Sequence, residues 1–141
     1  MNRQSQIETA TLILRIALGV MFLAHGLVLK FFTFGLEGTA GFFESIGYPA
    51  WTAYLVFALE TLGGIALILG IGTRMVSAIL IPILVGAAWV HVGNGWVFSA
   101  EGGGWEYPVY LVVLAVVQVL LGSGPASLDR KLGREAAPVI R

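Results

Sequence analysis

Two histidines stand at matching depths in two long apolar segments, and this spacing is the first indication of a chemical site. His25 lies about 16 positions after residue 9, and His91 about 16 positions after residue 75, the residues taken as the inner ends of their segments. At about 1.5 Å per helical residue, both imidazoles would lie roughly 24 Å from the inner edge of a membrane. We therefore expect a polar layer in the outer half of the protein. Other polar residues expected in it are Asn94, Glu106, Tyr107 and Tyr110, with Lys30 just above.

The aromatic residues are all assigned to the same half. The 8 Phe, 4 Trp and 4 Tyr leave residues 1–21, 58–88 and 111–141 without a ring. Because membrane proteins ordinarily carry aromatic belts at both interfaces, this one-sided placement predicts an aromatic-lined cavity or a docking surface. The residues expected to shape its walls are Phe22, Phe57, Trp89 and Tyr110.

A layer of this kind suits the head group of an isoprenoid quinone. His25, His91 and Glu106, with Asn94, would supply hydrogen bonds or exchange protons, since histidine titrates near neutral pH. Two histidines on neighbouring helices could instead be axial ligands of a haem, or hydrogen-bonded structural residues. The fourth apolar segment has no histidine that would extend a haem arrangement, so a quinone is favoured over haem. No metal site is predicted.

Two charged residues lie inside apolar segments. Arg15 is about six residues deep in the first segment, and Glu60 is about ten residues into the second. An ionised carboxylate at that depth costs several kcal/mol unless it is paired or takes up a proton. We expect Arg15 and Glu60 to form a structural ion pair that fixes the register of the bundle. His25 is the competing partner for Glu60, and a proton relay is the alternative role for the pair.

The composition predicts the elements that position these residues. Of the 141 residues, 57% are hydrophobic and 11% are charged, with a mean hydropathy of +0.88. Soluble domains carry about 25% charged residues, and one helical span needs about 20 residues. We predict an all-α integral membrane four-helix bundle, a single domain over residues 1–141. A short interfacial helix, capped by Thr39, is expected between spans one and two. The predicted segments are spans at about 10–29, 50–70, 75–92 and 107–121, and a polar tail at 122–141.

Charge fixes the expected orientation and excludes some functions. Basic residues near span ends are retained in the cytoplasm, so both termini are predicted to be cytoplasmic. Eight basic and eight acidic residues without a basic run argue against nucleic acid as a partner. The lack of cysteine excludes a disulfide relay, an iron–sulfur cluster and c-type haem. The inner side would hold Arg3, Arg15, Arg74, Arg130, Lys131, Arg134 and Arg141, and the outer side Lys30 alone.

The order of several short motifs resembles the DoxX family of small four-span bacterial membrane proteins, over roughly residues 10–130. They are R-I-A-L-G-V-M-F-L-A-H-G-L-V-L-K at 15–30, G-T-A-G-F-F-E-S-I-G-Y-P at 38–49, E-T-L-G-G at 60–64, G-T-R at 72–74, His91 with Asn94, and G-P-A-S-L-D ending at Asp129. The resemblance implies a multi-pass helical bundle in the bacterial cytoplasmic (inner) membrane, associated with redox metabolism. Some members are similar to a subunit of thiosulfate:quinone oxidoreductase, and others to membrane anchors of complexes that handle oxidative or thiol stress. The matching polar positions are Arg15, His25, Lys30, Glu60, Arg74 and His91.

Three functions from different classes remain at this stage, of which a transporter or channel ranks third, because four short spans can form a pathway only as an oligomer. The leading hypothesis is a quinone-linked or otherwise redox-associated membrane subunit, such as that of an oxidoreductase, with its site in the outer half. The alternative is a non-catalytic scaffold or lipid-binding anchor for a partner complex. The expected partners are membrane lipid and either further copies of this chain or a redox protein. Any thiol exchange would belong to a partner, because this chain has no cysteine.

Overall fold

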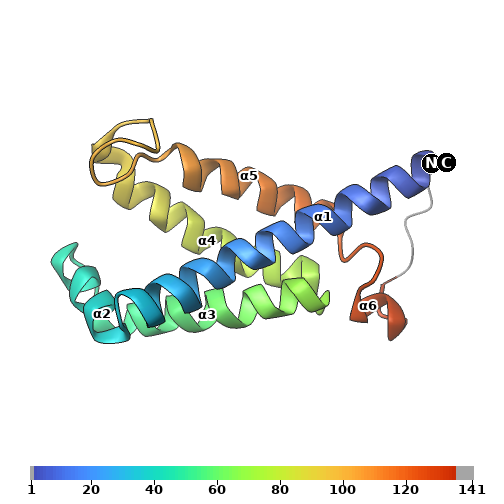
Figure 1. Ribbon diagram of the computed structural model, residues 1–141, viewed down its shortest axis with the longest axis horizontal. Coiled ribbons are helices and arrows are strands. Elements are labelled where there is room, and N and C mark those ends of the chain that lie inside the picture. Colours follow the sequence, from blue (N-terminus) through green and yellow to red (C-terminus); the bar gives the residue numbers. More distant parts are fainter. Residues whose placement is uncertain (1, 136–141) are drawn as a thin grey trace.

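The computed structural model describes residues 2–135, and every regular element in that range is a helix (Figure 1). The predictions made for residues 136–141, including the side of the membrane assigned to Arg141, concern residues outside the described range. In chain order the elements are α1 (Arg3–Leu23), the π-helix η1 (Ala24–Thr33), α2 (Leu36–Ser45), α3 (Ala50–Leu69), α4 (Thr73–His91), the short 3-10 helix η2 (Val92–Asn94), α5 (Glu106–Leu121) and α6 (Leu128–Lys131).

Within residues 2–135, three helical segments are long and apolar enough to cross a membrane. A fourth, α5, is apolar but has 16 residues, about 24 Å at 1.5 Å per residue against roughly 30 Å of hydrocarbon. The predicted all-α membrane bundle is confirmed, and the predicted second, third and fourth spans agree with α3, α4 and α5. The three long segments are Arg3–Thr33, Ala50–Leu69 and Thr73–Asn94.

Two glycines make the tight turn between α3 and α4. Gly70 ends α3 in the left-handed conformation, with φ 69° and ψ 48°, and Gly72 precedes α4 with φ 56°. A side chain with a Cβ disfavours this backbone geometry, so the glycine pair sets where the two helices end and begin. The turn therefore follows directly from the sequence Gly70-Ile71-Gly72.

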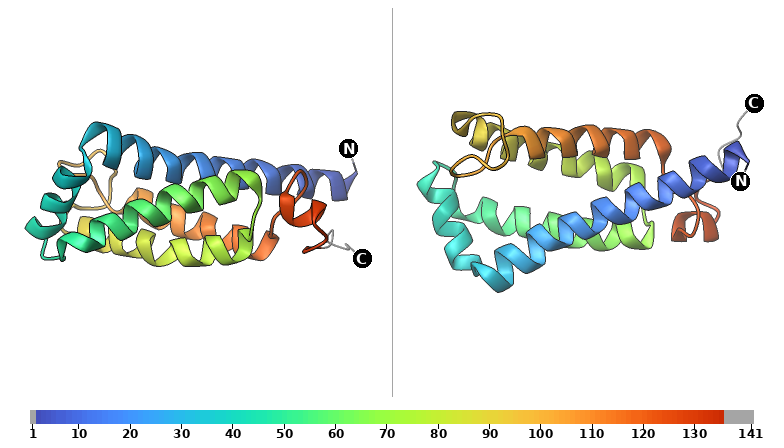
Figure 2. Two further views of the ribbon diagram at one scale, coloured as in Figure 1. Left: turned by 90° about the horizontal axis from the view of Figure 1, so that it is seen from below. Right: turned by 45° about the horizontal axis from the view of Figure 1, so that its top comes forward.

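The helices pack as two pairs, α1 with α3 and α4 with α5, which then meet along the middle of the bundle (Figures 1 and 2). Gly19 and Gly64 let α1 and α3 approach closely, because a Cβ on Gly64 would lie 2.8 Å from the Gly19 carbonyl oxygen. One set of side chains, which we call the apolar layer, joins all four long helices. It consists of Leu18, Phe22, Leu67, Leu80, Leu84, Leu111 and Ala115, each no more than 6% exposed.

The bundle has two distinct ends (Figure 2). At one, the α2 end, α2 lies across the bundle near the loop 95–105. At the other, the terminal end, the start of α1 lies near α6. The predicted interfacial helix is present as α2, but Thr39 is not its cap. Thr39 lies inside the helix and its hydroxyl is 3.1 Å from the Lys30 carbonyl oxygen and 2.9 Å from that of Gly35.

Residues 122–135, which we call the closing segment, fold against the terminal end. Part of the predicted polar tail is therefore packed. The Asp129 amide donates to the Gly70 carbonyl at 3.0 Å, and the Thr73 amide donates to the Asp129 carboxylate at 3.3 Å. Ser127 is the N-cap of α6, since its hydroxyl accepts from the Arg130 amide at 3.3 Å. The polar residues of this segment pack because the ends of α3 and α4 supply their partners.

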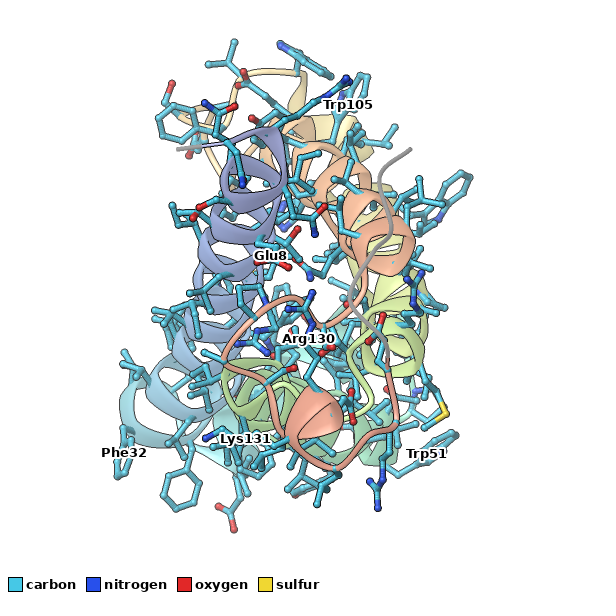
Figure 3. All side chains as sticks on the ribbon, turned by 90° about the vertical axis from the view of Figure 1, so that its right-hand side faces the viewer. Glu8, Phe32, Trp51, Trp105, Arg130 and Lys131 are labelled. Atoms are coloured by element: carbon cyan, nitrogen blue, oxygen red, sulfur yellow. The ribbon has the colours of Figure 1, made fainter. Side chains whose placement is uncertain are left out.

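Two ion pairs fasten the closing segment to the helices. Arg130 contacts the Glu8 carboxylate at 3.2 Å, and Figure 3, which looks at the terminal end, shows the two side chains near one another. Arg74 contacts Glu135 at 3.0 Å, and the Ser123 amide donates to the same carboxylate at 3.0 Å. Partial burial raises the pKa of Glu135, but the hydrogen bonds from Ser123 and Arg74 outweigh it. The pKa of Glu135 therefore lies below its ordinary value.

Candidate functional site

The strongest polar contact in the interior joins Lys30 of η1 to Glu60 of α3. The Lys30 ammonium lies 2.6 Å from the Glu60 carboxylate, and the two side chains are 17% and 8% exposed. Both residues belong to segments long enough to span a membrane. A charge at such a place requires a partner of opposite sign, and charged residues inside membrane segments commonly mark functional sites.

The π-helix explains why Lys30 can reach Glu60. In a π-helix hydrogen bonds join residues five apart, so Lys30 lies one wide turn after His25 and its ammonium donates to the His25 carbonyl at 3.4 Å. In an α-helix the same two residues would point about 140° apart. Gly26 brings η1 against α3, because a Cβ there would lie 3.0 Å from the Cβ of Glu60. The local change of helix type thus carries Lys30 onto the face that meets α3.

His25 connects this ion pair to α5. Its ring stacks on Tyr107 with centroids 6.2 Å apart, and it lies close enough to Glu60 to interact electrostatically. His25 Nδ1 is 2.9 Å from the Met21 carbonyl oxygen, which can only accept, so Nδ1 carries a proton. Nε2 is then the nitrogen that can take up or release a proton. We call Lys30, Glu60, His25 and Tyr107 the Lys30–Glu60 cluster.

The structure does not contain the predicted Arg15–Glu60 ion pair, because Glu60 pairs with Lys30. Arg15 donates to the carbonyl oxygens of Pro125 at 3.4 Å and Ala126 at 3.2 Å, in the closing segment, and its side chain lies against Gly70. The cause is the antiparallel register of α1 and α3. Arg15 faces the end of α3, ten residues beyond Glu60, which is about 15 Å along a helix.

His91 and Asn94 are brought together, but as part of the loop 95–105. The Asn94 amide lies 3.4 Å from His91 Nδ1 and donates to the carbonyls of Gly102 at 3.0 Å and Gly103 at 2.9 Å. Glu106 accepts from the Phe98 amide at 3.1 Å. Within residues 2–135, no hydrogen bond or ring contact joins His91 to His25. These predicted site residues therefore shape the loop at the α2 end and are separate from the Lys30–Glu60 cluster in their contacts.

The four predicted wall residues do not line one cavity. Phe22 belongs to the apolar layer, and Phe57 stacks on Phe31 with centroids 5.9 Å apart. Trp89 is 75% exposed and Tyr110 is 62% exposed, so both point away from the bundle interior. Trp89 instead borders a surface hollow of about 280 Å³ whose other lining residues are Ile46, Gly47, Tyr48 and Val90. Matching depth along the helices gave the level of these rings but not the direction in which they point.

The sequence predicts Tyr107 in the same layer as His25 and Lys30 just above it, but it predicts neither the contact of Tyr107 with His25 nor the ion pair of Lys30 with Glu60. It does not predict the partners of Arg15 either. The signal for Lys30 was its charge at the end of an apolar segment that faces another segment with a single acidic residue. Across residues 2–135, no group of three His, Asp or Glu side chains is gathered as a metal site would require.

The fold and the buried charges define a small all-helical membrane protein with a charged cluster toward one end of its bundle. The DoxX family matches residues 10–93, and the chain belongs to this family. It is 42% identical, over 122 residues covering 86% of each chain, to a protein of Bacillus subtilis (strain 168) named "Putative oxidoreductase CatD". It is 32% identical to an uncharacterized protein of Haemophilus influenzae over 120 residues, 84% of this chain and 87% of the relative. No solved structure gives a significant match.

Proposed function

We propose that the protein is a redox-associated membrane subunit that binds the head group of a quinone at the Lys30–Glu60 cluster. The single observation that carries the proposal is the 2.6 Å ion pair between Lys30 and Glu60 inside the bundle, with His25 and Tyr107 beside it. The π-helix η1 contributes Lys30 and His25 to this cluster, α3 contributes Glu60, and α5 contributes Tyr107.

The chemistry of the cluster fits such a ligand. A quinone has carbonyl oxygens that accept hydrogen bonds, an apolar ring and an apolar tail, and it supplies two-electron redox chemistry coupled to protons. Lys30 can donate to a carbonyl oxygen, and His25 Nε2 can hold or release a proton beside it. The Glu60 carboxylate balances the charge of Lys30, and the ring of Tyr107 offers a stacking surface. The relative named as an oxidoreductase supports the redox class, while the quinone is our assignment.

We assign a supporting role to the other predicted binding residues. His91, Asn94 and Glu106 hold the loop 95–105 over the α2 end through the contacts described above. Phe22 packs in the apolar layer, and the partly buried Phe57 stacks on Phe31. In this proposal Trp89 and Tyr110 contact lipid, which is the usual environment of exposed rings in a membrane helix.

We also propose that the terminal end is cytoplasmic in a bacterial inner membrane. The basic residues described at that end outnumber those at the α2 end, where Lys30 is the basic residue within the described range, and positive charge near span ends is retained in the cytoplasm. The basic residues concerned are Arg3, Arg74, Arg130, Lys131 and Arg134. The labelling experiment described below reports which end faces which side.

The test is the quinone content of the purified protein. We expect quinone to copurify with the unaltered chain, and to be lost in His25→Phe, which keeps an aromatic ring beside Tyr107 but removes both nitrogens. His91→Phe is the matched control, since it changes the other histidine and should retain quinone. A His25→Ala, His91→Ala double variant should also lose it. Equal quinone in all proteins, or none in the unaltered chain, would refute the proposal, and a Soret band would indicate haem instead.

A non-catalytic scaffold or lipid-binding anchor is the second candidate function. The observation that favours it is the exposure of large rings near the α2 end, which suits contact with lipid or a partner protein. Recovery of a stoichiometric partner, such as a redox protein, from native membranes without bound quinone would support this candidate. The rings concerned include Phe32 at 70%, Phe98 at 68%, Trp51 at 63% and Trp96 at 50% exposed.

A further inference from the structure

Buried side chains are sorted into three levels along the bundle. Along α1 and η1 the order from the terminal end is Arg15, then Leu18 and Phe22, then the partly buried His25. On α5, which runs in the opposite direction, the polar Gln118 lies nearest the terminal end, and the apolar Ala115 and Leu111 follow toward the α2 end. The buried positions Thr73, Ser77, Leu80 and Leu84 on α4 repeat the change from polar to apolar. The apolar layer therefore separates two polar regions.

The polar region on the terminal side is built for hydration. Nε and Nη1 of Arg15, whose side chain is 1% exposed, have no hydrogen-bond partner within the described residues, nor do the buried hydroxyls of Thr73 and Ser77 or Oε1 of Gln118. Buried polar atoms are almost always hydrogen-bonded, and internal water is the usual partner where protein groups do not suffice. This region can hold water up to the level of the apolar layer.

The apolar layer is a barrier to that water. Its seven side chains come from α1, α3, α4 and α5, so each long helix contributes, and none carries a polar atom beyond the backbone. Leu67 and Ala115 are fully buried, and Phe22 fills the α1 side at 1% exposure. Arg15 and His25 are ten residues apart along α1 and η1, about 15 Å at the rise of an α-helix, and Leu18 and Phe22 of the layer lie between them. A packed apolar layer offers water no hydrogen-bond partner.

The Lys30–Glu60 cluster lies beyond this barrier, toward the α2 end. Lys30 keeps 17% of its side chain exposed and Tyr107 keeps 44%, whereas the apolar layer below is closed. The first turn of α5, which holds Tyr107, and the junction of η1 with α2 both lie at this end. The cluster therefore lies nearer the α2 end than the apolar layer does, and it keeps exposed surface there.

We propose that the Lys30–Glu60 cluster exchanges protons with water only from the α2 end, and that the apolar layer isolates it from the terminal end. A proton released at His25 or Glu60 then goes to water on the α2 side, and a proton taken up comes from that side. This inference extends the proposed function by fixing the side of its proton exchange. Its test measures water access directly. The inference can therefore fail while quinone binding holds, and quinone binding can fail while the inference holds.

The lack of cysteine makes the test direct, because each single-cysteine variant carries one thiol. We would label His25→Cys and Leu84→Cys with a membrane-impermeant sulfonated maleimide, in spheroplasts and in inverted membrane vesicles. Ser99→Cys in the exposed loop 95–105 marks the α2 side, and Gln6→Cys on exposed α1 marks the terminal side. Tyr107→Cys, at a half-exposed position, serves as a second probe of the cluster should His25→Cys fold poorly.

We expect His25→Cys and Tyr107→Cys to react in the preparation in which Ser99→Cys reacts. Leu84→Cys should react at least about tenfold more slowly from both sides, because an apolar site raises the pKa of a thiol and suppresses the reactive thiolate. Reaction of His25→Cys or Tyr107→Cys together with Gln6→Cys would overturn the proposal. A rate for Leu84→Cys equal to that of His25→Cys would overturn it as well, since the layer would then admit water.

Discussion

Replacing Gly64 with alanine measures how closely α1 and α3 pack. A Cβ at this position would lie 2.8 Å from the Gly19 carbonyl oxygen and 2.9 Å from both the Leu23 amide nitrogen and its Cγ. Two of these three atoms are backbone, so a side-chain rotation cannot relieve the overlap and the helices must separate. Overpacking of this kind costs about 1–3 kcal/mol. Alanine returns up to about 1 kcal/mol through its higher helix propensity.

The expected net effect of Gly64→Ala is a loss of about 1–2 kcal/mol, or roughly 3–8 °C in the unfolding midpoint. Gly86→Ala is the matched control, since Gly86 lies within α4 and a Cβ there meets nothing within 4 Å. That variant should melt at or above the temperature of the unaltered protein. Thermal unfolding followed by tryptophan fluorescence in one detergent compares the three proteins. If Gly64→Ala melts as high as Gly86→Ala, the close approach of the two helices is refuted.

Three further predictions concern the charged contacts. Lys30→Met should lower stability by about 3–5 kcal/mol because it leaves Glu60 unpaired, and adding Glu60→Met should recover most of the loss; equal melting of the single and double variants would contradict the buried pair. Arg15→Met should free the closing segment, so trypsin should cleave after Arg130 faster than in the unaltered protein, and an unchanged cleavage rate would count against that anchor. The pKa of Glu135 is lower in the folded state than its ordinary value of roughly 4.3, so its contacts stabilise the closing segment fully above that value and are lost as pH falls through the folded pKa. The hydrogen-exchange protection of this segment, measured relative to the intrinsic exchange rate at each pH, should therefore fall below about pH 4, and Glu135→Gln should abolish the step; a step that persists in the variant would assign it to another group.

The sequence was sufficient to predict where the helices lie, but it did not predict which groups the buried charges contact. The lengths of the apolar segments predicted α3, α4 and α5, because a membrane span must satisfy its own backbone and bury few charges. Which charges meet depends on helix register. Glu60 lies opposite η1, and the change to π-helical geometry that brings Lys30 to it has no sequence signature that we could recognise.

Other contacts were hidden for a different reason. Arg15 is held by backbone carbonyl oxygens of Pro125 and Ala126, and every residue has such an oxygen, so side-chain chemistry gives no hint of this partner. Trp89 and Tyr110 were placed at the correct level along their helices, yet both point outward. Depth follows from counting residues, whereas direction depends on how the helices are rotated against each other.

The anchorage of Arg15 has a consequence for biosynthesis. Its two carbonyl acceptors lie 110 and 111 residues later in the chain, so the first helix enters the bilayer long before the ribosome has made the groups that will receive its guanidinium. At a synthesis rate of about 5–20 residues per second, this interval is on the order of 10 s. During that time the arginine must remain near water at the terminal end, and docking of residues 125 and 126 supplies its acceptors. A nascent chain stopped before residue 125 would contain all four predicted spans but would lack the two carbonyl groups that accept from Arg15.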